Sequence, residues 1–239
     1  IYHKSFLPNY SVFDEARYFS KGTEPNTLFW YDDIAIGINI CEDIWIEDGP
    51  AEEQVKQGAS LIININASPY DIHKSETRKE IVMKKALKLN VPIIYLNMVG
   101  GQDELVFDGG SFVVNDLGEI IYQASSFKEE VFHLDIDLKT NKQNDKSPLI
   151  IRPKTIELKD IESKASLSKN ESIYSALKLG LKDYVRKNKF TKVLIGISGG
   201  IDSALTAAIC VDALGAENVI GVAMPSKYNS KDSLDDAIK

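Results

Sequence analysis

A cysteine at the end of an apolar run is the first residue whose type and place suggest chemistry. Cys41 closes the run from Ile34 to Cys41 and is followed by Glu42 and Asp43. A thiolate in such a place could attack a carbonyl carbon, but a free cysteine is more often a small buried hydrophobic residue. Residue type alone leaves both interpretations open. The other cysteine, Cys210, lies among Ala, Ile and Val in a predicted helix, and we expect it in the core.

A glycine-rich loop is the second such feature. The apolar run 193–197 leads into Ser198-Gly199-Gly200-Ile201-Asp202-Ser203 and then into an Ala-rich segment. Glycines let backbone N–H groups approach an anion, and the N-terminus of a following helix adds partial positive charge. The pattern therefore predicts phosphate binding. The Lys of a Walker A motif and the spacing of a dinucleotide fingerprint are both missing, and a plain glycine turn capped by Ser or Asp is the alternative.

The elements that position these residues follow from periodicity. Apolar runs predict strands at 34–41, 61–66, 91–96, 193–197 and 219–224, and alternation predicts antiparallel strands within 104–137. Helical spacing predicts helices at 50–57, 75–89, 171–188 and 202–214, and the Lys-rich surface of helix 75–89 is expected to face solvent. Polar composition predicts a linker. The expected domains are 1–140, a linker at 141–170, and 171–239.

Composition limits the function classes. The 239 residues carry 28 Lys and Arg against 35 Asp and Glu, a net charge of −7 that argues against a general nucleic-acid surface. No apolar run approaches the roughly 18 residues of a membrane span. Two distant cysteines exclude a disulfide scaffold and favour the cytoplasm, and the three His residues have no zinc-site spacing. Because the chain begins at Ile1 inside patterned sequence, we expect a piece of a longer protein.

The loop at 198–203 resembles the SGGxDS loop of the ATP pyrophosphatases. The run MPSKY from Met224 to Tyr228 resembles the NAD synthetases, in which the Met lies near the adenine, although Asn229 stands where the family has a serine. Core packing at a strand end is the alternative for Met224. The resemblance implies ATP as a substrate, with Mg²⁺ for which Asp202 is a possible ligand or else a helix cap. The implied ATP-binding residues are Gly196, Ile197, Ser198, Gly199, Gly200, Ile201, Asp202, Ser203 and Met224.

The string GINICEDIW around Cys41 resembles the nucleophile elbow of the nitrilase (carbon–nitrogen hydrolase) superfamily. The string K-x-x-L-P-N-Y-x-V-F-D-E, which begins at Lys4, is similar to the glutaminase domain of glutamine-dependent NAD synthetases. The resemblance implies Cys41 as nucleophile and Lys4 as the cation that stabilises developing charge. It places the general base upstream of Lys4, before Ile1. Glutamine contacts are implied for Tyr10, Ser68 and Lys74, against the alternatives of a packed Tyr, a turn Ser and an exposed Lys.

The implied fold is α/β: a partial nitrilase-like α-β-β-α sandwich followed by the start of a Rossmann-like ATP-pyrophosphatase (PP-loop) domain with a parallel sheet. The implied function is that of a ligase in which Cys41 releases ammonia from glutamine. The ammonia then amidates ATP-adenylated deamido-NAD to give NAD, AMP and pyrophosphate. The expected full-length protein is a homo-oligomer without nucleic-acid or membrane partners, and the truncated chain is expected to show little turnover. The alternatives are an amidotransferase for another adenylated acid, or an inactive module that binds a ligand or self-associates.

Overall fold

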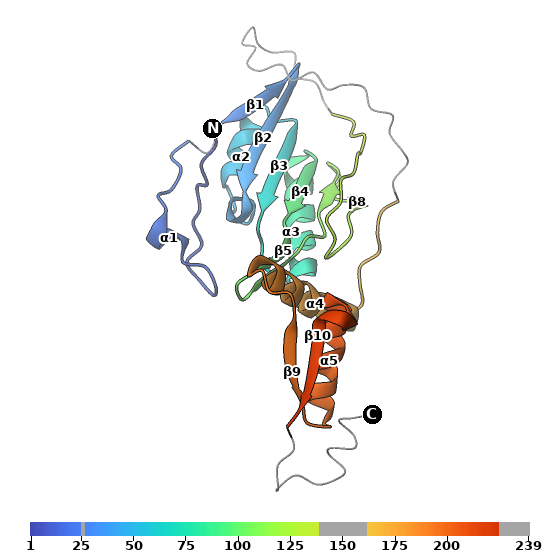
Figure 1. Cartoon of the computed structure of the whole chain (residues 1–239). Helices are drawn as coiled ribbons and strands as arrows, with labels where there is room; N and C mark the ends of the chain where they lie inside the picture. The colour runs from blue at the N-terminus through green and yellow to red at the C-terminus, as the bar shows by residue number, and fades with distance from the viewer. Residues whose placement is uncertain (25–26, 139–161, 225–239) are drawn as a thin grey trace. The chain divides into compact units, whose positions relative to one another are not determined.

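The computed structural model describes residues 1–24, 27–138 and 162–224, and these form two compact units (Figure 1). The first unit comprises Ile1–Met98 and Gly109–Ser166, and the second comprises Val99–Asp108 and Leu167–Lys239. Each unit mixes helices with a sheet that contains parallel strands, which confirms the predicted α/β class. Most of the predicted linker 141–170 lies outside the described residues, so the domain boundaries stay a prediction.

A six-stranded sheet forms the centre of the first unit, in the order β1-β2-β3-β4-β7-β8. Its strands are β1 (Leu28–Tyr31), β2 (Ile34–Ile40), β3 (Leu61–Asn66), β4 (Ile93–Asn97), β7 (Phe112–Val114) and β8 (Ile120–Gln123). The three central strands β2, β3 and β4 are parallel, whereas β1, β7 and β8 are antiparallel to their neighbours. The carboxyl ends of the parallel strands therefore lie along one edge of the sheet, where ligands of α/β proteins commonly bind.

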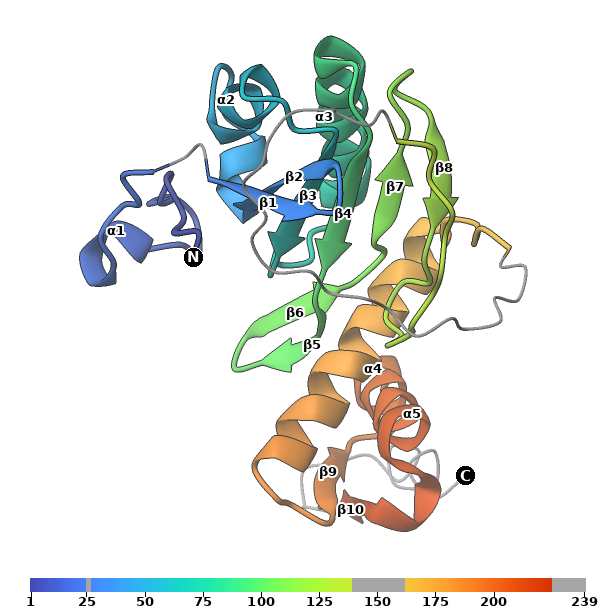
Figure 2. The same cartoon turned by 90° about the horizontal axis from the view of Figure 1, so that it is seen from above.

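Two helices, α2 (Pro50–Lys56) and α3 (Lys74–Leu89), cover one face of this sheet (Figure 2). Pro50 and the acidic first turn begin α2, as the sequence predicts. The strand residues that face the helices form the core with apolar residues of α2 and α3. The core comprises Ile44, Ala51, Ala59, Ile62, Val82, Ala86, Val91, Ile93, Tyr95, Phe112 and Val114.

The Lys-rich surface of α3 is not entirely solvated, so that expectation is wrong for two of its residues. Lys79 and Lys85 are buried. The Lys85 ammonium donates to Glu52 Oε1 at 2.7 Å and to the Ile46 carbonyl at 2.6 Å. Periodicity missed this because a lysine can be buried when a carboxylate and a carbonyl satisfy its charge and donors. The pair fixes the loop that follows Cys41 to α2 and α3.

The second unit contains two parallel strands, β9 (Val193–Ile197) and β10 (Val219–Ala223). Helix α4 (Lys169–Lys187) packs against α5 (Ile201–Leu214), and α5 packs against both strands, with a 3₁₀ turn, η2 (Ala216–Asn218), before β10. Ser168 caps α4 through a reciprocal bond with Glu171. Cys210 is buried in α5, as predicted.

A hairpin of β5 (Val99–Gln102) and β6 (Leu105–Asp108) also belongs to the second unit, although the sequence assigned it to the first domain. It contacts α4, where the Gly101 N–H donates to Asp183 Oδ2 at 2.7 Å and the Lys187 ammonium donates to the Gly101 carbonyl. A Cβ at Gly101 would lie 3.1 Å from the Gly180 Cα, so the close approach requires glycine. Of the strands predicted within 104–137, β6, β7 and β8 form, and residues 128–137 contain no strand.

Candidate functional site

Cys41 lies at the end of β2, where the chain turns sharply into the 3₁₀ helix η1 (Cys41–Ile44). Its φ is +46°, a left-handed conformation that few residues other than glycine adopt. The residue is 9% exposed, and the Asn64 side chain from β3 donates to its carbonyl at 3.4 Å. A strained turn that carries a cysteine at the carboxyl edge of a parallel sheet has the geometry of a nucleophile elbow.

Lys4 is the cation whose charge acts on this thiol. Its ammonium donates to Glu15 Oε2 at 2.6 Å and Oε1 at 2.8 Å, and its side chain is 13% exposed. Burial raises the pKa of the Cys41 thiol, the positive charge of Lys4 lowers it, and the negative charges of Glu42 and Glu15 raise it. Glu15 begins the short helix α1 (Glu15–Tyr18). Sequence reasoning gave Glu15 no role, although it belongs to the same string as Lys4.

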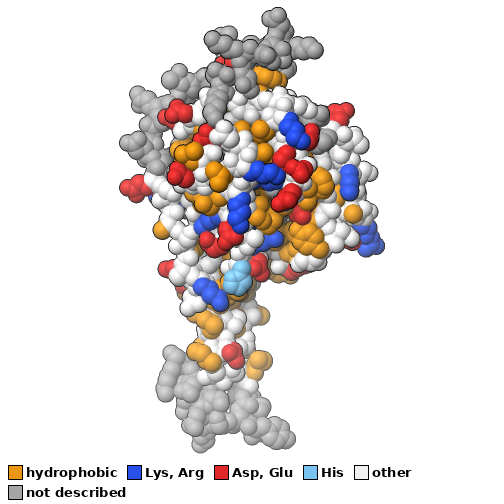
Figure 3. All heavy atoms as spheres, turned by 180° about the vertical axis from the view of Figure 1, so that it is seen from behind, with side chains coloured by type: hydrophobic (Ala, Val, Ile, Leu, Met, Phe, Trp, Pro, Cys, Tyr) orange, Lys and Arg blue, Asp and Glu red, His pale blue; other side chains and the backbone are white. Residues whose placement is uncertain are grey.

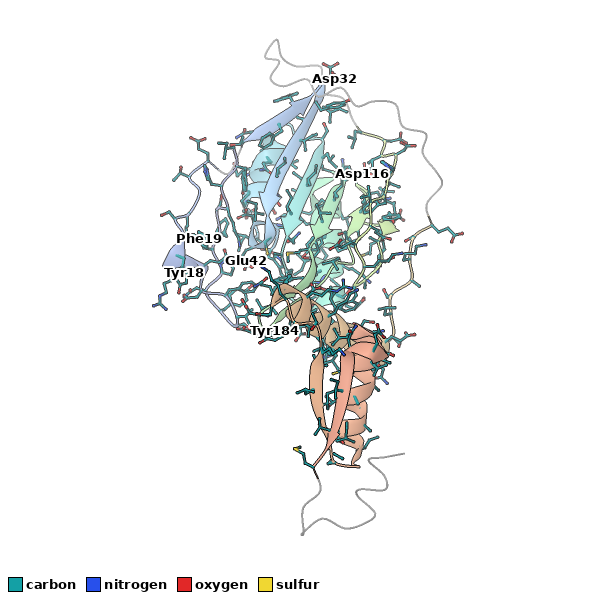
Figure 4. All side chains as sticks on the ribbon, in the orientation of Figure 1. Tyr18, Phe19, Asp32, Glu42, Asp116 and Tyr184 are labelled. Atoms are coloured by element: carbon teal, nitrogen blue, oxygen red, sulfur yellow. The ribbon has the colours of Figure 1, made fainter. Side chains whose placement is uncertain are left out.

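Tyr10 lies beside Glu42, the residue after the nucleophile. The Tyr10 hydroxyl donates to Glu42 Oε2 at 2.9 Å. Burial raises the pKa of Tyr10 to about 12, and the Glu42 carboxylate adds to the shift. Figure 4 shows Glu42 at the carboxyl end of β2, with Asp32 at the opposite end of the sheet. Two opposite charges therefore act on the Cys41 thiol, the cation of Lys4 and the anion of Glu42.

Ser68 and Lys74 lie after β3, on the same edge of the sheet as Cys41. Ser68 is 3% exposed. Its backbone N–H donates to Asn97 Oδ1 at 3.0 Å, and its hydroxyl accepts from Arg78 Nε at 3.2 Å. The Lys74 ammonium lies 4.8 Å from the centroid of the Trp45 ring, within cation–π range. Arg78 was missed in the sequence, where nothing distinguishes it from the other cations of α3.

The structure thus places all five residues predicted for the glutaminase site at the carboxyl edge of β2 and β3. Bonds to Asp43 and Glu42 hold the N-terminal segment with Lys4 and Tyr10 at this edge. Strand pairing explains the place of Cys41, Ser68 and Lys74, because Ile40 of β2 pairs with Ile65 of β3 in parallel register. The residues that follow the two strands must therefore emerge side by side. Their catalytic and binding roles remain predictions.

The loop after β9 forms a tight, self-bonded turn. The Ser198 N–H donates to Ser203 Oγ at 3.2 Å, and the Gly200 N–H donates to Ser198 Oγ at 3.3 Å. Ser203 Oγ donates to the Gly200 carbonyl at 2.9 Å. Gly199 has φ +80°, a conformation that favours glycine. The 14-residue helix α5 begins directly after this turn, at Ile201.

The remaining residues of the predicted ATP site surround this turn. Gly196 and Ile197 end β9, and Asp202 lies exposed in the first turn of α5. The Met224 side chain covers Gly196, since a Cβ built at Gly196 would lie 2.7 Å from Met224 Cε. Met224 is largely exposed and follows β10. The rest of the MPSKY run, 225–228, lies outside the described residues.

The described residues also bear on metal sites, surface charge and membrane-spanning helices. Within the described ranges, no group of three or more His, Cys, Asp or Glu side chains could hold a metal ion. Figure 3 shows acidic and basic side chains interspersed on the displayed face, without a continuous basic field. No helix among the described residues is both long and apolar enough to cross a membrane.

Two parts of the chain match known protein families. Residues 1–144 match the carbon–nitrogen hydrolase family model, and residues 173–239 match the NAD synthase model. The chain is 44% identical to glutamine-dependent NAD(+) synthetases from Aquifex aeolicus and Thermotoga maritima over 99% of its length. A solved glutamine-dependent NAD+ synthetase from Acinetobacter baumannii, in complex with ADP, is similar at 41% identity with a TM-score of 0.83, and the match covers 99% of this chain and 42% of that one.

These relatives are longer than the chain, which spans 44% of the Aquifex and Thermotoga proteins. The model of the first family covers more than half of the chain and includes the cysteine elbow, while the second includes the glycine loop. The chain therefore belongs to the carbon–nitrogen hydrolase family and carries, in residues 173–239, a segment of the NAD synthase family.

Proposed function

We propose that the full-length protein containing this chain is an ATP-dependent carbon–nitrogen ligase. It hydrolyses glutamine at Cys41 and transfers the ammonia to adenylated deamido-NAD, giving NAD, AMP and pyrophosphate. The observation that carries the proposal is a strained cysteine elbow in which the positive charge of Lys4 lowers the pKa of the thiol. The same chain contains a glycine loop suited to phosphate. The names of the longer relatives support the pairing of the two activities.

In the first step, the Cys41 thiolate attacks the carboxamide carbon of glutamine. Ammonia leaves as a γ-glutamyl thioester forms, and water then cleaves the thioester to glutamate. The Lys4 ammonium stabilises the oxyanion of each tetrahedral intermediate. Glu15 holds Lys4 through two short bonds and so fixes the direction of its charge. The resemblance to the nitrilase superfamily supplies the general base upstream of Lys4.

Glutamine itself needs partners of both signs. Lys74 offers a cation for the α-carboxylate, and its packing on the Trp45 ring limits where the ammonium can lie. Tyr10 and Ser68 offer polar contacts. Arg78, bonded to the Ser68 hydroxyl and carbonyl, holds Ser68 in place for this role.

In the second step, the loop from Gly196 to Ser203 binds the phosphates of ATP, and Met224 lies near the adenine. Mg²⁺ suits this arrangement, since it is commonly held by one or two carboxylates together with substrate phosphates. Asp202, exposed at the start of α5, would be the protein ligand. The ion would neutralise charge on the departing pyrophosphate. The proposal places the protein in the cytoplasm, where cysteines such as Cys41 and Cys210 stay reduced, and takes it to be a homo-oligomer.

Nitrogen tracing tests the proposal in the full-length protein. With amide-¹⁵N glutamine, ATP and deamido-NAD, we expect ¹⁵N in the amide of NAD and one AMP and one pyrophosphate per NAD formed. If deamido-NAD fails to stimulate ATP cleavage, the acceptor is a different acid. If the full-length protein releases neither glutamate nor AMP, the chain is part of an inactive binding module. Mass spectrometry of the products distinguishes the three outcomes.

A further inference from the structure

The Asp43 side chain, fully buried two residues after the nucleophile, is the acceptor for four donors. Its Oδ1 accepts from the backbone N–H groups of Ser5 at 3.1 Å and Phe6 at 2.9 Å. Its Oδ2 accepts from the Tyr2 hydroxyl at 2.8 Å and from the Ile40 N–H at 3.0 Å. Three of these donors flank Lys4 in the sequence, and the fourth directly precedes Cys41.

The segment that carries Lys4 is not held by a helix or a strand of its own. Residues 1–14 form no helix or strand in the part of the chain that the structure describes. Its backbone is bonded to residue 22, where the Gly22 N–H donates to the Lys4 carbonyl at 2.8 Å. Three direct bonds join this segment to the turn at Cys41 through the buried Asp43 carboxylate, and the exposed Tyr10 hydroxyl adds a bond to Glu42. One buried group thus joins the cation and the nucleophile.

We propose that Asp43 is a positioning residue that fixes the Lys4 ammonium relative to the Cys41 thiol. This inference rests on the proposed roles of Lys4 and Cys41 in glutamine hydrolysis. It assigns Asp43 no contact with substrate. The carboxylate acts by holding the backbone on both sides of Lys4 and by closing the turn that begins at Ile40.

A carboxylate suits this position better than its amide. Two carboxylate oxygens offer about four acceptor sites, which matches the four donors, whereas an amide offers one oxygen and two donors. Asparagine at 43 could keep the Ser5 and Phe6 N–H bonds, but its NH₂ group would then face the Ile40 N–H. Burial raises the pKa of Asp43, and the Tyr2 hydroxyl and the three backbone donors oppose that shift. The donors therefore favour the charged form that the arrangement needs.

The charges that act on the Cys41 thiol make the inference measurable. Lys4 lowers the pKa of Cys41, while Glu42 and Glu15 raise it. A thiol reacts with iodoacetamide as the thiolate, so a higher pKa moves its alkylation profile to higher pH. Losing Lys4, or freeing its segment, should therefore slow alkylation of Cys41 near pH 8. The assay uses the 239-residue chain and does not require glutamine turnover.

The experiment measures alkylation of Cys41 between pH 6 and 10 by peptide mass spectrometry. In Lys4→Met, we expect the rate at pH 8 to fall by roughly threefold or more and the profile to move to higher pH. Asp43→Ala should produce a shift of the same sign. The double variant should shift no further than Lys4→Met alone, because both changes remove the same interaction.

Milder variants and an internal standard separate positioning from loss of fold. Cys210 reports folding in every sample, since unfolding would speed its alkylation. If Asp43→Ala unfolds, Asp43→Asn and Tyr2→Phe carry the test, and each should give a smaller shift of the same sign. Tyr174→Phe is the matched control, because Tyr174 donates to a different carboxylate, Asp212, at 2.9 Å, and it should leave the Cys41 profile unchanged.

Two results would contradict this inference, and they can be told apart. If Lys4→Met shifts the profile but the folded Asp43 and Tyr2 variants match the original chain, Asp43 is not a positioning residue. If Lys4→Met itself leaves the profile unchanged, the proposed pairing of Lys4 with Cys41 fails, and the proposed glutaminase site fails with it.

Discussion

Replacing Cys41 with alanine abolishes glutamine-supported NAD formation in the full-length protein, with a fall of roughly 10³-fold or more. The thiolate forms the covalent intermediate, and alanine offers no nucleophile to take its place. Ammonia added directly bypasses this step, so ammonium-supported NAD formation should stay within about twofold of the original rate, since that synthetase chemistry does not use the Cys41 thiol. The measurement is the initial rate of NAD formation with each nitrogen source.

Cys210 provides the matched control for this prediction. It is also buried and free, but it lies in α5 within the second unit. Cys210→Ala should retain glutamine-supported activity. Equal losses with glutamine and ammonium in Cys41→Ala would mean that the substitution damages the whole protein. Full retention of glutamine-supported activity would remove Cys41 as the nucleophile.

Substitution of Gly199 with alanine should reduce NAD formation with both nitrogen sources, by roughly 10²-fold. Gly199 has φ +80°, and an L-residue there strains the turn that we propose binds the phosphates of ATP. Because adenylation precedes amidation, adding ammonia cannot rescue this variant. The rate of pyrophosphate release gives the direct measurement.

Gly58→Ala controls for backbone strain in general. Gly58 also has a positive φ, +104°. Gly58 lies in the first unit, after α2, outside the proposed ATP site. We expect a comparable loss of stability with nearly full pyrophosphate release. If the two variants lost activity equally, strain rather than phosphate binding would explain the Gly199 effect.

Much of the fold was predictable because the elements that carry the two sites are continuous apolar strands. The strands 61–66 and 193–197 agree with β3 and β9 residue for residue, and the glycine loop falls between β9 and α5 as expected. Parallel pairing then brings Cys41 and Ser68 to one edge. Local pattern is sufficient here, since a short continuous run of Ile, Leu and Val predicts a strand even where alternate residues are exposed, as in β9.

The features that were missed depend on contacts between distant residues. Burial of Lys85 requires Glu52, 33 positions away, to satisfy its charge. Lys4 pairs with Glu15, 11 positions away, and three bonds to Asp43 join a segment without regular structure to the turn at Cys41. The hairpin at 99–108 contains Gly100 and Gly101, which have low strand propensity, and its contact with α4 depends on the small size of Gly101. Periodicity carries no information on such contacts.

Covalent trapping tests the central claim, that Cys41 is the glutaminase nucleophile, most directly. The full-length protein is incubated with an electrophilic glutamine analogue, such as a diazoketone, and its peptides are mapped by mass spectrometry. We expect one adduct on Cys41, none on Cys210, protection by excess glutamine, and loss of glutamine-supported NAD formation in proportion to labelling. Inactivation without an adduct on Cys41, or with the adduct on another residue, would contradict the account.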